Sequence, residues 1–330
     1  MPNRRHLLLS QIAAAGLAAV GHSRTALAEI VQKTSRIIVG FPDGGTTDVL
    51  ARVCAEKLRG PYAPTVIVDN KPGAAGRIAL TNSAAVESDG TASFLAPCSL
   101  LFIYPHVYRK LGYDPVRDFA PVSPIAQGDF ALTVGPMVPD GVRTPRDFVA
   151  WVKANPKQAF FASPAAGATP HFVGVMFAKA AGIELTHAVY RGDAPGVQDL
   201  LGGQIACSVN NIGVILPHVK SGKLRVLATS GAKRSRFLPD APTFAEAGYR
   251  DVQAQEVFGF FMPSRTSPAV VEQFAKAVED VVRQPDVGQK FAEFSFEPMS
   301  LKPAEFAALM KSERERWAGV VKASGFQIDD

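Results

Sequence analysis

The sequence predicts an α/β protein of two lobes with a ligand cleft between them, and three observations support this. Strand-like and helix-like segments alternate along almost the whole chain, as in sheets whose strands are joined by crossover helices. Glycines and small polar residues gather directly after the strand-like segments, where open α/β sheets bind ligands. The chain has 330 residues, which exceeds one typical domain, so two lobes are the expected organisation.

Each expected element is identified by its residue pattern. Short runs of β-branched and other apolar residues predict strands, and they occupy 36–39, 65–68, 93–96, 159–162, 186–189, 206–209, 224–229 and 257–262. Longer runs with apolar residues at helical spacing predict helices, and they occupy 49–58, 78–87, 145–154, 170–181, 195–201, 268–283 and 303–323. Thr144 and Pro145 mark the start of one of these helices as a cap and a first-turn proline.

The first 28 residues are expected to be a cleaved export signal rather than part of the fold. Arg4 and Arg5 form a positive region, residues 7–20 are apolar, and Ala26-Leu27-Ala28 is a small-residue cleavage site. The paired arginines resemble a twin-arginine signal, and export by the Sec route fits nearly as well. We therefore expect cleavage after Ala28 and a mature protein in the periplasm.

The charge of the mature chain argues against a nucleic-acid partner. Removing residues 1–28 takes away three arginines and no acids, so 35 basic residues become 32 against 30 acidic ones. The formal charge falls from +5 to 32 − 30 = +2. No run of lysines and arginines with interleaved aromatic residues remains to bind nucleic acid.

The sequence gives no sign of a cofactor, a metal or a catalytic centre. Cys54, Cys98 and Cys207 are widely spaced, which predicts three buried structural thiols, with a Cys54–Cys98 disulfide as the alternative. The six histidines are scattered and not spaced as metal ligands. Ser163 and His171 lack a third partner for hydrolysis, and the G-x-S-x-G motif is absent. We therefore expect a protein that is not an enzyme.

The segment 41–48 is the most informative loop, because it joins the first strand to the first helix. Its residues, Phe41-Pro42-Asp43-Gly44-Gly45-Thr46-Thr47-Asp48, place two glycines and two hydroxyls at a helix N-terminus. Such a junction presents backbone N–H groups and the positive end of the helix dipole to an anion. Dinucleotide and Walker motifs are absent, so a carboxylate is the simplest ligand. The alternative is a tight turn in which Asp48 only caps the helix.

Five further loops carry glycines and small polar residues directly after strands. They are 72–76, 97–99, 163–169, 190–195 and 210–211. Since ligands of open α/β sheets bind outside the carboxyl ends of the strands, we expect these loops to line one cleft. The alternative is that each is an ordinary turn, because loops of α/β proteins always contain such residues.

Many segments resemble, in the same order, the receptors of tripartite tricarboxylate transporters, also called Bug-type periplasmic receptors. They include Asn70-Lys71-Pro72-Gly73-Ala74-Ala75-Gly76 and Tyr190-Arg191-Gly192, with 37–48, 113–122, 163–171, 200–204, 223–225, 238–243 and 246–248. The resemblance covers essentially the whole mature chain and implies a two-lobe, hinged periplasmic binding protein, type II-like. We expect lobe one to comprise 29–130 and 255–330, and lobe two to comprise 131–254.

The resemblance also implies a small carboxylate as the ligand and indicates which residues contact it. Loops matching 41–48 and 72–76 hold one carboxylate through backbone N–H groups, hydroxyls and waters, and loops matching 163–171, 190–192 and 210–211 close on the rest. The expected contacts are Phe41, Gly44, Gly45, Thr46, Thr47, Asp48, Ala74, Ala75, Gly76, Ser99, Ser163, Gly167, Thr169, His171, Tyr190, Arg191, Gly192, Asn210 and Asn211.

Two of these residues have an alternative role, and two positions depart from the family pattern. His171 is either a ligand donor or a capping or core residue, and Arg191 either pairs with a distal carboxylate or lies in solvent. Asp43 replaces a usual proline, so its carboxylate either turns to solvent or repels the anion. Asn210 stands where many family members have an aspartate. Because a neutral Asn210 cannot compensate an ammonium group, we expect a ligand without an amino group. The alternative is that Asp193 or Glu256 takes over the acidic role.

The resemblance implies partners in the membrane. A receptor of this family delivers its ligand to the membrane subunits of a tripartite transporter. The alternative partner is the ectodomain of a histidine kinase, in a sensing role. We expect the receptor itself to be a monomer.

Overall fold

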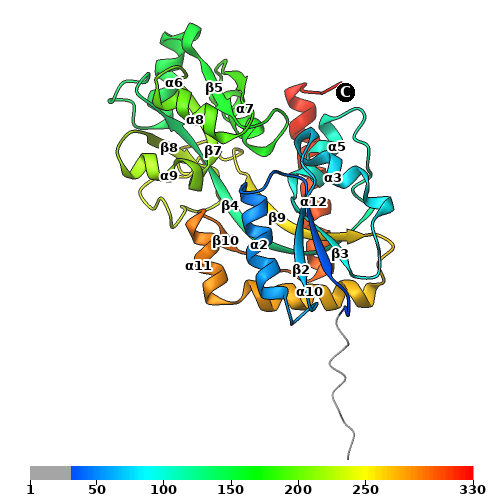
Figure 1. Ribbon diagram of the computed structural model, residues 1–330. Coiled ribbons are helices and arrows are strands. Elements are labelled where there is room, and N and C mark those ends of the chain that lie inside the picture. Colours follow the sequence, from blue (N-terminus) through cyan, green and yellow to red (C-terminus); the bar gives the residue numbers. More distant parts are fainter. Residues whose placement is uncertain (1–30, 330) are drawn as a thin grey trace, which may run out of the picture.

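The computed structural model describes residues 31–329, which form a mixed α/β fold (Figure 1). The expected export signal and its cleavage after Ala28 lie outside these residues. The strands are β1 (Ser35–Val39), β2 (Val66–Asn70), β3 (Ala92–Pro97), β4 (Phe119–Val134), β5 (Phe160–Ser163), β6 (Thr186–Val189), β7 (Cys207–Asn211), β8 (Arg225–Thr229), β9 (Gln255–Pro263) and β10 (Glu297–Pro298). The helices are α2 (Thr46–Leu58), α3 (Arg77–Thr81), α4 (Ser99–Phe102), α5 (Tyr104–Val107), α6 (Pro145–Ala154), α7 (Thr169–Ala181), α8 (Asp193–Leu201), α9 (Ile212–Lys220), α10 (Pro268–Val282), α11 (Pro285–Glu293) and α12 (Pro303–Ser324).

Every segment that was expected to be a strand or a helix forms an element of that type, with bounds shifted by a few residues. The largest difference is the helix expected over 78–87. It ends at Thr81 and is followed by a 3₁₀ turn at Ser83–Ala85. The helix expected over 145–154 begins where its pattern indicates, because the Thr144 hydroxyl and the Asp147 carboxylate form a reciprocal capping box.

The sheet is mixed, with both parallel and antiparallel strand pairs. Its strand order is β2-β1-β3-β9-β4-β7-β5-β6, with β8 and β10 also paired to β4. The pairs β1–β2, β1–β3, β5–β6 and β5–β7 are parallel, whereas β9 and β4 run antiparallel to the strands beside them. The sequence pattern does not indicate the long strand β4, because Pro121, Pro124 and Gly128 interrupt its apolar run.

Strand β4 passes through both lobes of the molecule. From Phe119 to Asp129 it pairs with β9, and from Phe130 onward it pairs with β7 and then also with β8. Lobe one therefore contains β1, β2, β3 and β9, and lobe two contains β5 to β8 (Figure 1). The chain crosses between these groups of strands within β4 and again where it enters β9, and the lobe boundaries expected at 130/131 and 254/255 stay a prediction. That the lobes move about these crossings stays a prediction.

One buried hydroxyl connects the segments that cross between the lobes. The Oγ of Ser230 accepts a hydrogen bond from the N–H of Phe130 at 2.9 Å and donates one to the carbonyl of Ala254 at 2.5 Å. The backbone of Ser230 makes two more bonds to the same two residues. A buried hydroxyl that both donates and accepts is fully satisfied, so it stabilises the geometry of the crossing.

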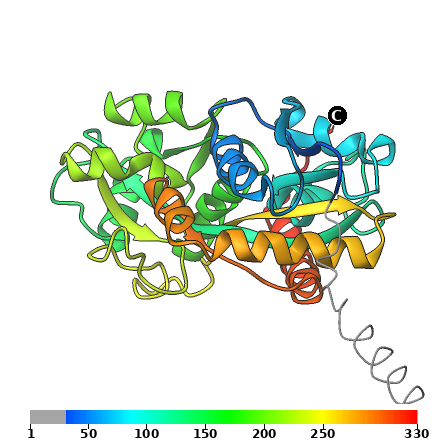
Figure 2. The ribbon, with the colours of Figure 1, turned by 60° about the horizontal axis from the view of Figure 1, so that its bottom comes forward.

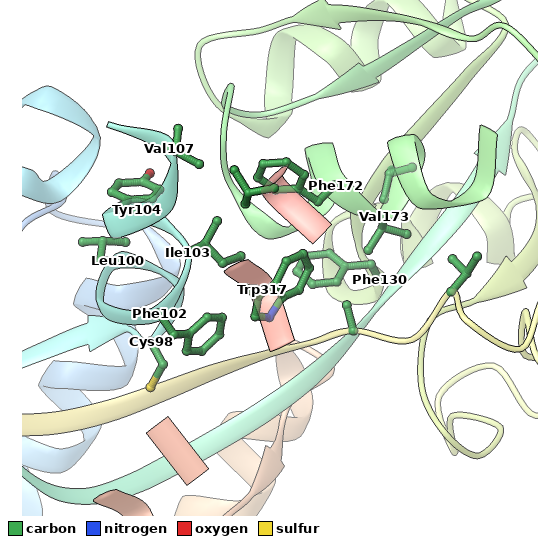
Figure 3. Packing of buried hydrophobic residues seen from close by; sticks show 14 of the residues in the cluster. Cys98, Leu100, Phe102, Ile103, Tyr104, Val107, Phe130, Phe172, Val173 and Trp317 are labelled. Atoms are coloured by element: carbon green, nitrogen blue, oxygen red, sulfur yellow. The ribbon is translucent and has the colours of Figure 1, made fainter. Parts of the chain in front are cut away.

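An aromatic core runs from one lobe into the other. The fully buried ring of Trp317, on α12, stacks on Phe102 of α4 with 6.3 Å between centroids. Phe172 of α7 lies 5.8 Å from the same indole, and Figure 3 shows these side chains converging. Helix α12 therefore packs against elements of both lobes.

Helices cover the sheet of lobe one, and their apolar faces explain why they form. The long helix α10 lies alongside β4 (Figure 2) and buries Val271, Phe274 and Val278 at helical spacing. Among residues 31–329, no helix is both long and apolar enough to cross a membrane.

The three cysteines are free and buried. This confirms the prediction of three buried thiols and removes the alternative of a Cys54–Cys98 disulfide. Burial raises the pKa of the Cys54 thiol to about 12, so the reactive thiolate is scarce at neutral pH.

Candidate binding cleft

The six expected loops follow parallel strands, three in each lobe, and the loops of the two lobes face each other. Ser99 of lobe one and Thr169 of lobe two both donate hydrogen bonds to Glu256 on β9. Gly167 of lobe two is packed so closely on lobe one that a Cβ there would lie 2.9 Å from Val107. These contacts are what a cleft between two lobes requires.

In the loop 41–48, the carboxylate of Asp48 has structural partners. It is buried, and it accepts hydrogen bonds from the N–H of Gly44 (2.9 Å), from Arg52 Nε (2.8 Å) and from Asn70 Nδ2 (2.9 Å). Burial is the largest influence on its pKa and raises it, but the hydrogen bonds from Arg52, Gly44 and Asn70 together bring the pKa below its usual value. Asp48 therefore orders the loop, and it occupies the Gly44 N–H that the sequence pattern offered to an anion.

The N-terminus of α2 remains open beside this carboxylate. Gly45 is the N-cap and provides no side-chain cap, and its own N–H donates to the carbonyl of Pro42 at 3.3 Å. Within the described residues, the N–H groups of 46–48 have no hydrogen-bond partner. The left-handed residue is Gly44, with φ of 76°, whereas Gly45 has an ordinary φ of −74°. Gly45 is therefore not required for its backbone conformation, although its position lets the chain approach a ligand.

The loop 72–76 is strained and lies against the first loop. Ala74 and Ala75 have φ values of 45° and 53°, in the left-handed region that residues with a Cβ rarely adopt. A Cβ on Gly40 would lie 2.6 Å from the carbonyl oxygen of Gly76, and a Cβ on Gly76 would lie 2.9 Å from the Phe41 ring. The structure thus brings these two loops together, and strain of this kind is concentrated at ligand-binding segments.

The contacts of His171 are those of a core residue. Its Nδ1 accepts the N–H of Gly167 at 3.1 Å, and its ring stacks on His187 with 3.9 Å between centroids. The hydroxyl of Ser163 is in turn 2.7 Å from His187 Nε2. Burial, with the nearby His187 as a second cause, lowers the pKa of His171 to about 3, and burial lowers that of His187 to about 4. Both rings are neutral at physiological pH and stabilise the loop 163–171.

In the loop 190–192, one large side chain is held by a neighbouring helix and the other is exposed. Tyr190 donates its hydroxyl proton to Asp199 of α8 at 2.7 Å, and burial raises the pKa of Tyr190 to about 12. Arg191 is exposed and has no ion pair within the described part of the chain, and whether it pairs with a ligand carboxylate stays a prediction. Gly192, with φ of 94°, is the N-cap of α8 and provides no side-chain hydrogen bond to the first turn of the helix.

At the end of β7, two buried amides have unsatisfied atoms. Asn210 donates to Asp193 Oδ1 at 2.7 Å, but its Oδ1 has no partner, and neither does the Nδ2 of Asn211, within residues 31–329. Burial raises the pKa of Asp193 against the hydrogen bond from Asn210. The structure therefore adds a carboxyl group beside Asn210, so the neutral amide alone does not determine the charge of this part of the cleft.

From the sequence, Glu256 is only an alternative acidic partner for the ligand and not one of the expected contacts. Its side chain lies between the hydroxyls of Ser99 and Thr169, at 3.3 Å from each. Burial raises the pKa of Glu256 to about 7, although both hydroxyls lower it. The strand pattern of β9 indicates that the Glu256 side chain lies on the opposite face of the sheet from those of Gln255 and Val257. Only the fold shows which elements of the two lobes it contacts. No group of three or more His, Cys, Asp or Glu among the described residues could hold a metal ion.

A cavity of about 300 Å³ lies next to β9, and of the six expected loops only 97–99 contributes to its lining. Gln255 and Val257, the neighbours of Glu256 on the strand, both line it, as alternation along a strand requires. Other lining residues are Cys98, Phe102, Met299, Met310 and Arg316. Val257 therefore faces this cavity, on the side of β9 away from Glu256.

Comparison with known proteins agrees with this geometry. A family model described as "Tripartite tricarboxylate transporter family receptor" matches residues 50–326. Protein BugT of Bordetella pertussis is 32% identical over 319 residues, which cover 96% of each protein. Among solved structures, R. palustris Rpa4515 with adipate is 30% identical with a TM-score of 0.81, covering 89% of this chain and 98% of that one. The periplasmic binding protein BugD is 28% identical with a TM-score of 0.76, covering 90% and 99%.

These matches confirm the resemblance and the fold class that the sequence predicts. They extend over nearly the whole chain, and they combine a family model, a curated relative and solved structures. The chain thus belongs to the tripartite tricarboxylate transporter family receptors, which are periplasmic solute-binding proteins and not enzymes.

Proposed function

We propose that this receptor captures a small carboxylate between its lobes and delivers it to the membrane subunits of a tripartite transporter. The observation that carries the proposal is the open N-terminus of α2 beside the strained loop 72–76. Backbone N–H groups at a helix N-terminus bind an anion without the desolvation cost of burying a lysine or arginine. The adipate bound to the R. palustris relative supports the same ligand class.

Most of the groups that we assign as contacts lack a protein partner in the part of the chain that the structure describes; the exception is Thr169, whose hydroxyl donates to Glu256. One carboxylate receives hydrogen bonds from the N–H groups of 46–48 and the hydroxyls of Thr46 and Thr47, next to 74–76. The second lobe contributes Thr169 and the unpaired Nδ2 of Asn211. Asp48, His171 and Tyr190 act by positioning these loops, because their polar groups already have protein partners.

Closure of the lobes buries the ligand. We assign 29–130 and 255–330 to lobe one and 131–254 to lobe two, with the hinge where β4 and the segment entering β9 cross. The contact between Gly167 and Val107 supports a closed arrangement, because it joins loops of opposite lobes.

A thermal-shift panel tests the ligand class. Adipate, succinate and glutarate are expected to raise the melting temperature, because a ligand that binds only the folded state stabilises it. Matched amines and neutral sugars are expected to have no effect. Stabilisation by amines or sugars without any by carboxylates would refute the proposal.

A glycine variant tests the proximal loop. Gly45→Val is expected to lose carboxylate affinity and keep the fold, since the new Cβ would meet only the Pro42 carbonyl, at 3.2 Å. Gly141→Val is the matched control, because Gly141 has open space around it and lies outside the cleft loops. Unchanged affinity in Gly45→Val would mean that the loop is only a turn.

The membrane partner requires a separate test. The family description supports the transporter subunits, and the histidine-kinase ectodomain is the alternative. Ligand-dependent co-purification with the membrane subunits is expected, with the receptor eluting as a monomer in light-scattering chromatography. Co-purification with a kinase ectodomain instead would establish the sensing role.

A further inference from the structure

We propose that Glu256 binds a proton when the carboxylate ligand enters the cleft, so that its carboxyl O–H donates a hydrogen bond to the ligand. This inference rests on the proposed function and adds a specificity-determining residue to it. Where Glu256 is ionised before binding, one proton moves from solvent to a carboxylate oxygen of Glu256 without any other covalent bond being made or broken.

The position of Glu256 is the first argument. It stands on β9 at the crossing between the lobes, and its two oxygens accept hydrogen bonds from Ser99 at the start of α4 and from Thr169 at the start of α7. One carboxyl group thus contacts the loops of both lobes. Its partner across the β4–β9 pair is Gly128, and a Cβ on Gly128 would lie 2.9 Å from the unpaired Nδ2 of Asn211. An unsatisfied buried donor therefore lies beside the residue that pairs with Glu256 in the sheet.

The surroundings of Glu256 lack a positive partner, which is the second argument. Within the described chain it forms no ion pair, and its hydrogen-bond donors are neutral hydroxyls and backbone N–H groups. The titratable groups that its charge influences are the Cys98 thiol at the end of β3 and the Tyr104 hydroxyl of α5. Both are neutral at physiological pH, because burial raises their pKa values.

The nearby charged groups do not provide Glu256 with a positive partner. Glu313 of α12 influences Cys98 but is not among the groups that shift the pKa of Glu256. Arg77 acts on Tyr104 and lies over the Tyr108 ring, but it is not among the groups that shift the pKa of Glu256. Asp193 of α8 is another carboxyl group of the cleft loops, and it accepts a hydrogen bond from Asn210.

The ligand's charge then decides the protonation state. Without ligand, burial gives Glu256 a pKa of about 7, so the group is close to half protonated at neutral pH. A second carboxylate in the same cleft cannot remain beside an ionised Glu256 without a counter-charge, and two close carboxyl groups share a proton instead. The protonated form turns a repulsive neighbour into a donor, and it frees a hydroxyl of Ser99 or Thr169 to contact the ligand.

Calorimetry with adipate as the probe tests this proton uptake. In wild-type protein, the dissociation constant is expected to rise about 30-fold from pH 6 to pH 8.5, as one proton per ligand and a free pKa of about 7 require. The binding heat at pH 8 is expected to differ between phosphate and Tris buffers by nearly the full difference between the ionisation enthalpies of the two buffers. Glu256→Gln is expected to bind adipate equally at both pH values, about as tightly as wild type at pH 6, because the amide is a permanent donor.

Asp129→Asn is the matched control. Asp129 is also a carboxyl group whose pKa burial raises, but its oxygen accepts from Gln255 and it is not a neighbour of Ser99 or Thr169. This variant is expected to keep the wild-type pH dependence. Loss of that dependence in Asp129→Asn would overturn the assignment to Glu256.

Other outcomes separate this inference from the proposed function. Adipate binding that is independent of pH and buffer would overturn the proton uptake and leave the carboxylate receptor intact. Loss of adipate binding in a folded Glu256→Gln variant would also overturn it. Tighter binding of aspartate than succinate, abolished in Glu256→Gln, would make Glu256 an ionised partner of an ammonium group. If no carboxylate binds wild-type protein, the proposed function fails and this inference fails with it.

Discussion

The stacked histidine pair predicts that the receptor loses stability in mild acid. An unfolded histidine has a pKa of about 6.5, whereas burial lowers that of His171 to about 3 and that of His187 to about 4. Between these values the unfolded chain binds more protons than the folded chain. The contribution of the pair is therefore fully present above pH 6.5 and is lost as the pH falls through 6.5 toward 4.

The magnitude follows from the two pKa differences. At pH 5 each unfolded histidine is almost fully protonated and each folded one almost fully neutral, which costs about 2 kcal/mol per group relative to pH 7.5. Together the two histidines lower the free energy of unfolding by about 4 kcal/mol between pH 7.5 and pH 5. This figure changes little for any pKa in the folded state below about 4. Glu256 opposes the loss, because its raised pKa makes the folded state gain protons over the same range.

The assay therefore compares how much the free energy of unfolding changes with pH in the two proteins, and not its value at one pH. Urea unfolding of wild type and of His171→Asn/His187→Gln is measured at pH 7.5 and pH 5. Asparagine keeps an acceptor for the N–H of Gly167, and glutamine keeps a partner for Ser163. Between pH 7.5 and pH 5, the free energy of unfolding of the double variant is expected to fall by about 4 kcal/mol less than that of wild type.

Proton NMR of the wild-type imidazoles gives an independent check that needs no variant. The resonances of the two stacked rings are expected to stay unchanged from pH 8 to pH 5. Equal acid sensitivity of wild type and double variant, or imidazole resonances that titrate near pH 6.5, would refute the reasoning.

Three further predictions concern stability and accessibility. Ser230→Ala is expected to lower the free energy of unfolding by about 1–3 kcal/mol in urea titrations, because it leaves buried partners unsatisfied at the crossing. Gly40→Ala is expected to destabilise the fold much more than Gly45→Ala, since its Cβ would lie 2.6 Å from the Gly76 carbonyl; equal melting temperatures would contradict this. The three free thiols are expected to react with a thiol reagent only after denaturation, and fast reaction of the native protein would contradict their burial.

The sequence predicts the regular elements of this fold well, because their patterns are local. The parallel strands are short apolar runs, and the helix at 145–154 has a cap, a first-turn proline and an apolar face. Strand β4 escapes such reasoning, since its prolines are tolerated only where register shifts interrupt the ladder with β9. The antiparallel course of β4 and β9 likewise depends on which strands become neighbours, and no local pattern records that.

The candidate site divides in the same way. The loops after the strands are recognisable from their glycines, and the structure brings 41–48 and 72–76 into contact. The direction of a side chain is not recognisable, so the sequence does not show that Asp48 turns inward to Arg52 or that Tyr190 turns to Asp199. Glu256 has no neighbouring motif, and only the crossing of the lobes brings it between two hydroxyls.

The contact between Ser163 and His187 illustrates why geometry alone does not make a catalytic pair. Their side chains are 2.7 Å apart, which is the separation of a nucleophile and its base. However, Ser163 is 1% exposed, and the His187 ring is stacked between aromatic neighbours without a carboxylate partner among the described residues. Burial lowers the pKa of His187 to about 4, which makes it a far weaker proton acceptor than an ordinary imidazole. The same contact that suggests hydrolysis instead stabilises a loop of the binding cleft.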